Sequence, residues 1–181
     1  MVNNNIDFFA TELRKSLGIT GPIANVGEFV GKLPHAKVEP HPHTLLDLSL
    51  NHGLIRKHKD GSFTILTPSI ATQDRINYNL AYALGHLILH LGSFGTDSEH
   101  WESLKCFFEH TCSLKEDDEN HCFALSFLMP KQEVLAALEQ FQIVCDYSNE
   151  LAPEDVKTLS NYFSVPEVFV LQQLKWLDII F

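Results

Sequence analysis

The sequence predicts an α+β domain in which a small antiparallel sheet packs against helices. Two observations predict this class. The 181-residue chain changes its hydrophobic period, from helical spacing to a strand-like stretch over residues 45–67 and back to helical spacing. Hydrophobic residues make up 45% of the chain and charged residues 20%, which is the balance of a globular protein able to bury a core.

Two helices are expected before the strand-like stretch. Apolar residues recur at helical spacing from Ile6 to Leu17, and Gly18 follows as a stop. A second, short helix is expected over residues 23–33, where Pro34 ends it.

The strand-like stretch itself predicts three strands. The first covers residues 45–50. Residues 54–58 and 62–67 then flank a Lys-Asp-Gly turn at positions 59–61, which is a good signal for a hairpin. Pro68 closes the last strand.

The rest of the chain predicts helices. Thr72 is a suitable N-cap for a helix over residues 76–91, which is mostly apolar and therefore expected to be central and buried. Another helix is expected over residues 99–110. A further one follows the acidic run at 116–119 and ends before Pro130. Beyond it, the tail contains two more helices that separate near residues 164–166.

The buried helix over residues 76–91 carries one polar stripe. Asn79, Tyr82, His86 and His90 follow one another at spacings of three, four and four, so they share a face. Two interpretations remain open. Histidines one turn apart can present two imidazole nitrogens to one metal ion, or they can be core histidines that hydrogen-bond to neighbours.

Two segments resemble motifs of one family. Residues 80–90 (LAYALGHLILH) resemble the A-H-E-L-G-H-x-x-x-H segment of the ImmA/IrrE family of zinc metallopeptidases. Residues 119–124 (ENHCFA), followed by 127–130 (FLMP), are similar to that family's E-A-N-x-F-A-x-x-L-L-M-P. Together with the tail, the resemblance covers roughly residues 5–179.

The resemblance implies a zincin-like metallopeptidase fold. In such a fold the buried helix is the active-site helix, and it lies beside the small antiparallel sheet. The metallopeptidase-like domain would cover residues 1–130. A C-terminal helical segment over residues 131–181 would pack on that domain.

The family's site residues match this chain only in part. Its two motif histidines bind zinc at the positions of Tyr82 and His86, and the glutamate that activates water falls at Ala83. The third ligand matches Glu119, and His90 could substitute for a missing ligand, as could Tyr82. A neutral phenol, with a pKa near 10, is a poor ligand for zinc at pH 7. The resemblance therefore implies either no cofactor or weakly bound zinc.

The residue at the general-base position decides the expected activity. A base that takes the proton from a metal-bound water contributes about 10²–10⁴ in rate, and the methyl group of Ala83 cannot take it. No catalytic residue is therefore assigned. Glu119 either points into the former active-site cleft or, with the rest of the 116–119 run, stabilises a helix N-terminus.

Charge and composition limit the classes of partner that this chain is expected to bind. A formal net charge of −10 argues against a broad phosphate-binding face, and the helix expected over residues 167–178 has Lys175 as its only basic residue. No apolar stretch approaches the roughly 20 residues that cross a bilayer. No secretory signal is recognisable at residues 1–7. We expect a cytoplasmic protein that binds neither nucleic acid directly nor membranes.

Two functions are compatible with the resemblance. Members of the ImmA/IrrE family typically cleave helix-turn-helix repressors of mobile elements or stress pathways. The first is a catalytically inactive, metallopeptidase-like protein that regulates such a repressor by binding it. The alternative is an active zinc-dependent metallopeptidase that cleaves the repressor with an altered ligand set. Ala83 favours the first function.

Overall fold

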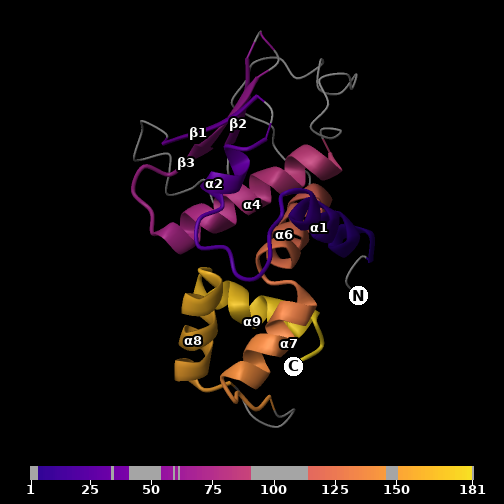
Figure 1. The fold of residues 1–181 in the computed structure, drawn as a ribbon, viewed down its shortest axis with the longest axis vertical. Helices are drawn as coiled ribbons and strands as arrows, with labels where there is room; N and C mark the ends of the chain where they lie inside the picture. The colour runs from indigo at the N-terminus through magenta and orange to yellow at the C-terminus, as the bar shows by residue number, and fades with distance from the viewer. Residues whose placement is uncertain are drawn as a thin grey trace.

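The protein is an α+β domain with few strands and many helices (Figure 1). The computed structural model describes residues 4–33, 35–40, 54–58, 60, 62–90, 114–145 and 151–180. The strand predicted over residues 45–50 and the helix predicted over 99–110 lie outside these ranges. The described elements are, in order, α1 (Asn4–Ser16), α2 (Gly27–Val30), β1 (Ala36–Pro40), β2 (Leu54–Lys57), β3 (Phe63–Thr67), α4 (Gln73–Leu89), α6 (Leu114–Leu128), α7 (Lys131–Gln140), α8 (Pro153–Phe163) and α9 (Glu167–Trp176).

The three described strands form a mixed sheet in the order β1-β3-β2. β2 and β3 pair antiparallel, with Ile55 opposite Ile65, as the hairpin signal predicts. β1 pairs parallel with β3 and places Val38 opposite the same Ile65. The prediction of an antiparallel sheet is therefore wrong for one of the two pairings. The hairpin partner occupies one edge of β3, and β1 takes the other edge in the direction of β3.

The hairpin turn is held by a side chain. The Asp60 carboxylate accepts hydrogen bonds from the backbone nitrogen of Ser62 at 3.0 Å and from its hydroxyl at 2.6 Å. These bonds lower the pKa of Asp60. The backbone nitrogen of His58 donates to the Ser62 carbonyl at 2.8 Å. This arrangement sets the register that buries all five residues of β3.

α4 is the central helix, as its apolar sequence predicts. It begins after Thr72, with Asp74 in its first turn, and every residue from 77 to 87 is buried. The helix packs against β3 on one side and α6 on another (Figure 1). Gly85 permits the close approach to α6, because a Cβ atom at that position would lie 3.0 Å from Cβ of Phe123. None of the described helices combines the length and apolar character needed to cross a membrane.

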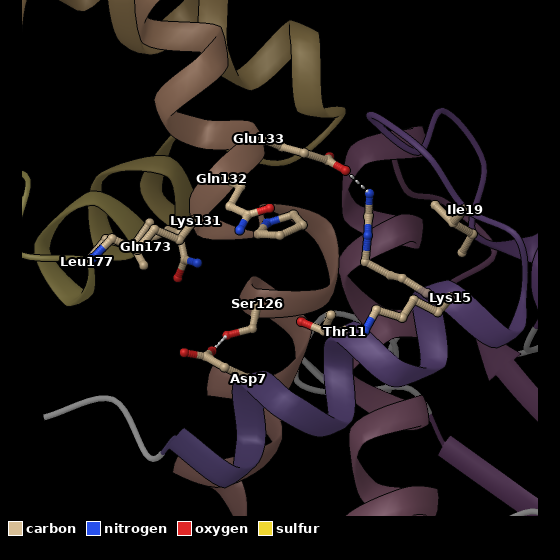
Figure 2. Close-up of a pocket in the computed structure, with 12 residues that line it drawn as sticks. Asp7, Thr11, Lys15, Ile19, Ser126, Lys131, Gln132, Glu133, Gln173 and Leu177 are labelled. Atoms are coloured by element: carbon tan, nitrogen blue, oxygen red, sulfur yellow. Dashed lines mark hydrogen bonds and ion pairs between the residues drawn. The ribbon is translucent and has the colours of Figure 1, made fainter.

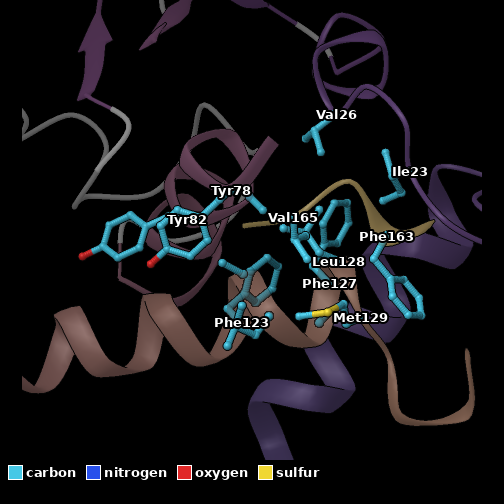
Figure 3. Packing of buried hydrophobic residues seen from close by; sticks show 14 of the residues in the cluster. Ile23, Val26, Tyr78, Tyr82, Phe123, Phe127, Leu128, Met129, Phe163 and Val165 are labelled. Atoms are coloured by element: carbon cyan, nitrogen blue, oxygen red, sulfur yellow. The ribbon is translucent and has the colours of Figure 1, made fainter. Parts of the chain in front are cut away.

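The helices after Pro130 attach to the end of α6. α7 begins directly after Pro130, while α8 and α9 pack against each other, and α9 also contacts α6. The buried Gln173 of α9 donates its amide hydrogen to the Met129 carbonyl at 2.8 Å. Figure 3 shows Met129 and Phe127 in the apolar core, near Phe163 from α8. The C-terminal helices therefore complete the core.

A single buried asparagine joins three parts of the chain, and we call this contact the Asn77 junction. The side-chain oxygen of Asn77 accepts from the Val26 backbone nitrogen at 3.0 Å. Its amide nitrogen donates to the carbonyls of Ala24 at 3.1 Å and Ser164 at 3.2 Å. The junction ties the chain before α2 and the turn between α8 and α9 to α4.

Candidate functional site

The polar stripe of α4 faces polar residues of α6, and together they form a row that we call the polar seam. α4 and α6 pack against each other directly. Four pairs bridge them: Tyr78–His121, Tyr82–Asp117, His86–Asn120 and His90–Glu119. Tyr78 and Tyr82 lie at the edge of the apolar core, where Figure 3 shows them beside Phe123.

Tyr82 occupies the position matched to the first zinc-binding histidine. Its side chain is buried, and its hydroxyl donates a hydrogen bond to Oδ1 of Asp117. This bond requires the hydroxyl hydrogen. A phenol that binds zinc must instead lose its proton. The contact with Asp117 therefore uses Tyr82 as a donor and opposes its use as a metal ligand.

His86 occupies the position matched to the second zinc-binding histidine. It is also buried, and its Nδ1 lies 3.3 Å from Nδ2 of Asn120. An amide nitrogen is only a donor, so Nδ1 of His86 must be the acceptor. The hydrogen of a neutral His86 ring then lies on Nε2. A metal at Nε2 would require the hydrogen to lie on Nδ1, and the Asn120 amide would then have to turn its oxygen toward that hydrogen.

Glu119 is half-buried and lies against the C-terminal end of α4. Its Oε2 is 3.6 Å from Nε2 of His90, and its Oε1 is 3.5 Å from Nζ of Lys115. The structure thus brings two of the predicted residues, Glu119 and His90, into one pair. The ring centroids of His86 and His90 are 5.5 Å apart, so the seam is continuous along this end of α4.

The general-base position is sealed in the core. Ala83 is completely buried and offers only its methyl group. Asn79, one turn before it, is equally buried. Neither the oxygen nor the nitrogen of the Asn79 amide has a hydrogen-bond partner among the described residues. This face of α4 therefore combines a methyl group, at the position matched to the general base, with an unsatisfied amide.

The first seam pair extends to α9. The Tyr78 hydroxyl lies 2.6 Å from Nδ1 of His121, whose Nε2 lies 3.0 Å from Oε1 of Gln172. Because the Gln172 oxygen can only accept, His121 carries its hydrogen on Nε2 and accepts from Tyr78 at Nδ1. Burial raises the pKa of Tyr78, so the phenol stays protonated in this network. Phe169 stacks on Tyr78 with ring centroids 3.9 Å apart.

The residues present do not fit the zinc centre that the resemblance implies. Tyr82 donates to a carboxylate, and His86 accepts from an amide. Glu119 is paired with His90 and Lys115. Within the described part of the chain, no three His, Cys, Asp or Glu side chains gather as a metal site would require. The chemistry of the seam is hydrogen bonding between two helices.

Comparison with known proteins shows a similarity of fold to a solved structure, and no match in sequence. No protein-family model matches the chain, and no curated protein matches it. Among solved structures, it is similar to a Mycobacterium tuberculosis transcriptional regulator with a TM-score of 0.60 and 14% sequence identity. The two chains share a fold. The match covers 95% of this chain and 46% of the regulator, so this chain spans about half the length of that protein.

The sequence pattern predicted three of the four α4 residues of the seam, Tyr82, His86 and His90, but missed Tyr78 and most of the α6 side. Asp117, Asn120 and His121 follow one another at spacings of three and one, and 117 and 121 are one turn apart. Residues at these spacings share a helix face, so a polar face on α6 was recognisable. The pairing between the two faces depends on helix packing, which the sequence does not state.

Proposed function

We propose that this chain is a non-catalytic regulatory module that controls a helix-turn-helix repressor by binding it. The polar seam is the observation that carries the proposal. Tyr82 and His86, at two of the positions matched to zinc ligands, form hydrogen bonds between α4 and α6, and Glu119, at the third, lies 3.6 Å from His90. Such contacts stabilise a rigid surface for a partner, and they engage side chains that a zinc site would need.

Peptide hydrolysis also needs a proton acceptor beside the attacking water. Ala83 provides none, and it is completely buried. Glu119 could act as the base only after separating from His90. It contacts α4 at His90, which lies nearly two helical turns beyond Ala83. The loss of a general base removes about 10²–10⁴ in rate. Binding without cleavage is the function that these residues support.

A protein partner is favoured over DNA. In α9, the helix that would have to read bases, Gln172 contacts His121 and Gln173 contacts the Met129 carbonyl. Only Lys175 remains as a basic residue on that helix. The formal net charge of −10 repels phosphates but attracts a partner rich in Lys and Arg, as DNA-binding repressors are. The similar solved protein is described as a transcriptional regulator, which supports a place in transcription.

The test combines capture with cleavage. The purified chain is mixed, with zinc present, with each helix-turn-helix repressor of the source genome in turn, and the mixture is followed by size-exclusion chromatography and mass spectrometry. We expect a complex in which the repressor stays intact. The Tyr82→Phe variant is the matched control, because it removes the hydroxyl from a matched ligand position and keeps the ring.

Two results would contradict the proposal. One is cleavage of the repressor by the unmodified chain that a chelator abolishes. The other is the absence of a complex with any of these repressors at concentrations where the chain is folded. Cleavage by a Tyr82→His, Ala83→Glu double variant alone would support it, because it would show that the lost groups separate binding from hydrolysis.

A further inference from the structure

A pocket of about 390 Å³ lies apart from the polar seam, between α1, the start of α7 and α9 (Figure 2). None of the residues that line it belongs to the seam. Its volume is in the range of small-ligand sites. Figure 2 shows Asp7 and Ser126 on one side of the pocket, and Glu133 on another.

Two of the three cationic residues that line the pocket, Arg14 and Lys15, already have partners within the protein, and the third, Lys131, is exposed. The buried guanidinium of Arg14 donates to the Phe127 carbonyl at 2.7 Å, to the Gly21 carbonyl at 2.8 Å and to Oε1 of Glu133. Lys15 is paired with Glu12 at 2.7 Å. Burial lowers the pKa of Arg14, and the charge of Glu133 opposes this effect. The Arg14 guanidinium therefore has little capacity left for an anionic ligand.

Several acceptors of the pocket are, in contrast, still available. Oε2 of Glu133 is buried and accepts no hydrogen bond from any residue that the structure describes. Gln173 is 2% exposed, and its amide nitrogen is fixed on the Met129 carbonyl, so its oxygen is the group left to accept from a ligand. The Asp7 carboxylate, which accepts from the Ser126 hydroxyl, supplies a second negative charge.

We propose that this pocket binds a primary ammonium or guanidinium group carried on a short aliphatic stem. The cationic head would donate to Glu133 and the Gln173 oxygen, with Asp7 contributing charge. The apolar parts of Ile19, Pro130 and Leu177 also line the pocket and suit the stem. The net charge of −10 raises the local concentration of such cations.

The cationic group can come from a free small molecule or from a Lys or Arg side chain of a protein. Both sources present the same head on the same kind of stem. Binding of a small probe is independent of the proposed repressor binding, because none of the lining residues belongs to the seam. Failure of one proposal therefore leaves the other standing.

The test uses isothermal titration calorimetry with three probes of similar shape. Butylguanidinium is the cationic probe, butylurea is its neutral analogue and pentanoate is the anionic control. Because hydrogen bonds between charged groups are stronger than those to neutral ones, we expect butylguanidinium to bind at least about tenfold more tightly than butylurea. Equal binding of the two probes, tighter binding of pentanoate, or no binding of butylguanidinium would overturn the proposal.

Two variants within the pocket and one control variant outside it locate the site. Glu133→Gln removes the unpaired carboxylate oxygen and is expected to weaken butylguanidinium binding about tenfold. Glu139→Gln, an exposed site on the same helix and outside the pocket lining, changes the net charge equally and should leave binding unchanged. Since Glu133 also holds Arg14, Asp7→Asn repeats the test without that contact. Unchanged affinity in Glu133→Gln and Asp7→Asn would overturn the assignment.

A blocked tripeptide with a central arginine distinguishes the two sources. Tighter binding of this peptide than of butylguanidinium assigns the site to a protein side chain. Weaker binding assigns it to a free small molecule. Both results support a cation site, whereas equal binding of a tripeptide with citrulline in place of arginine would overturn it.

Discussion

Two buried asparagines in nearby positions of α4 differ in their hydrogen bonding. Asn77 and Asn79 are separated by one residue, and both are completely buried. Asn77 forms a junction that satisfies its oxygen and its nitrogen. Asn79, on the stripe of the polar seam, has no hydrogen-bond partner among the described residues. A buried polar residue with partners stabilises the fold, whereas one without partners lowers its stability.

The Asn77 junction should be the more sensitive region. Asn77→Ala removes the partner of the Val26 nitrogen and of the carbonyls that its amide reaches. Each buried group left unsatisfied costs about 1–3 kcal/mol, so we expect the free energy of unfolding to fall by about 3 kcal/mol. Urea denaturation measures the change. A loss below about 0.5 kcal/mol would show that the junction does not hold these segments together.

Steric contact between α4 and α6 should give the next largest effect. Gly85→Ala places a Cβ atom 3.0 Å from Cβ and Cδ1 of Phe123, in a tightly packed interface. Overpacking costs about 1–3 kcal/mol, which outweighs the gain in helix propensity of about 1 kcal/mol. We expect the thermal midpoint and the free energy of unfolding to fall. Gly31→Ala is the control, because its nearest contact is 3.4 Å and it should be nearly neutral.

Asn79→Ala should have the opposite sign to Asn77→Ala. The variant deletes two buried atoms that have no hydrogen-bond partner among the described residues. The relief of this cost and the higher helix propensity of alanine exceed the loss of packing, so we expect stability to rise by about 1 kcal/mol. The same urea titration measures both variants. A destabilisation equal to that of Asn77→Ala would remove the distinction between the two regions.

The smallest effect concerns the thiol of Cys122, which lies on α6 beside His121 of the seam. Burial, followed by nearby carboxylates, raises its pKa to about 11. The unfolded thiol ionises near its ordinary pKa of about 8.5 while the folded thiol stays protonated. Its contribution to stability is therefore complete below about pH 8.5 and is lost as the pH rises to about 11. Urea titrations across this range should show a weaker decline for Cys122→Ala, and parallel curves would contradict this assignment.

Periodicity predicted much of the fold. The apolar run of α4, the hairpin of β2 and β3 and the break near residues 164–166 all follow from local patterns. β1 escaped prediction because its residues are only half-buried or exposed, and the two apolar ones that pack toward the core, Ala36 and Val38, are separated by the charged Lys37. Its pairing with β3 is a long-range contact, and no local pattern gives its direction.

The candidate site was predicted from one side only. The spacing of Tyr82, His86 and His90 places them on a shared face, and the structure confirms that they line one interface. Which groups they meet depends on how α6 is rotated against α4. That rotation places Glu119 beside His90. It also places the amide nitrogen of Asn120 beside His86.

Zinc content tests the central claim that the seam is a structural contact. The unmodified chain and the Tyr82→His, Ala83→Glu variant are purified without added zinc, dialysed against equal zinc and analysed by mass spectrometry for metal per chain. We predict sub-stoichiometric zinc in the unmodified chain and clearly more in the variant, which regains a ligand that the seam lacks. One tightly held zinc per unmodified chain, whose removal by a chelator lowers stability, would contradict the account.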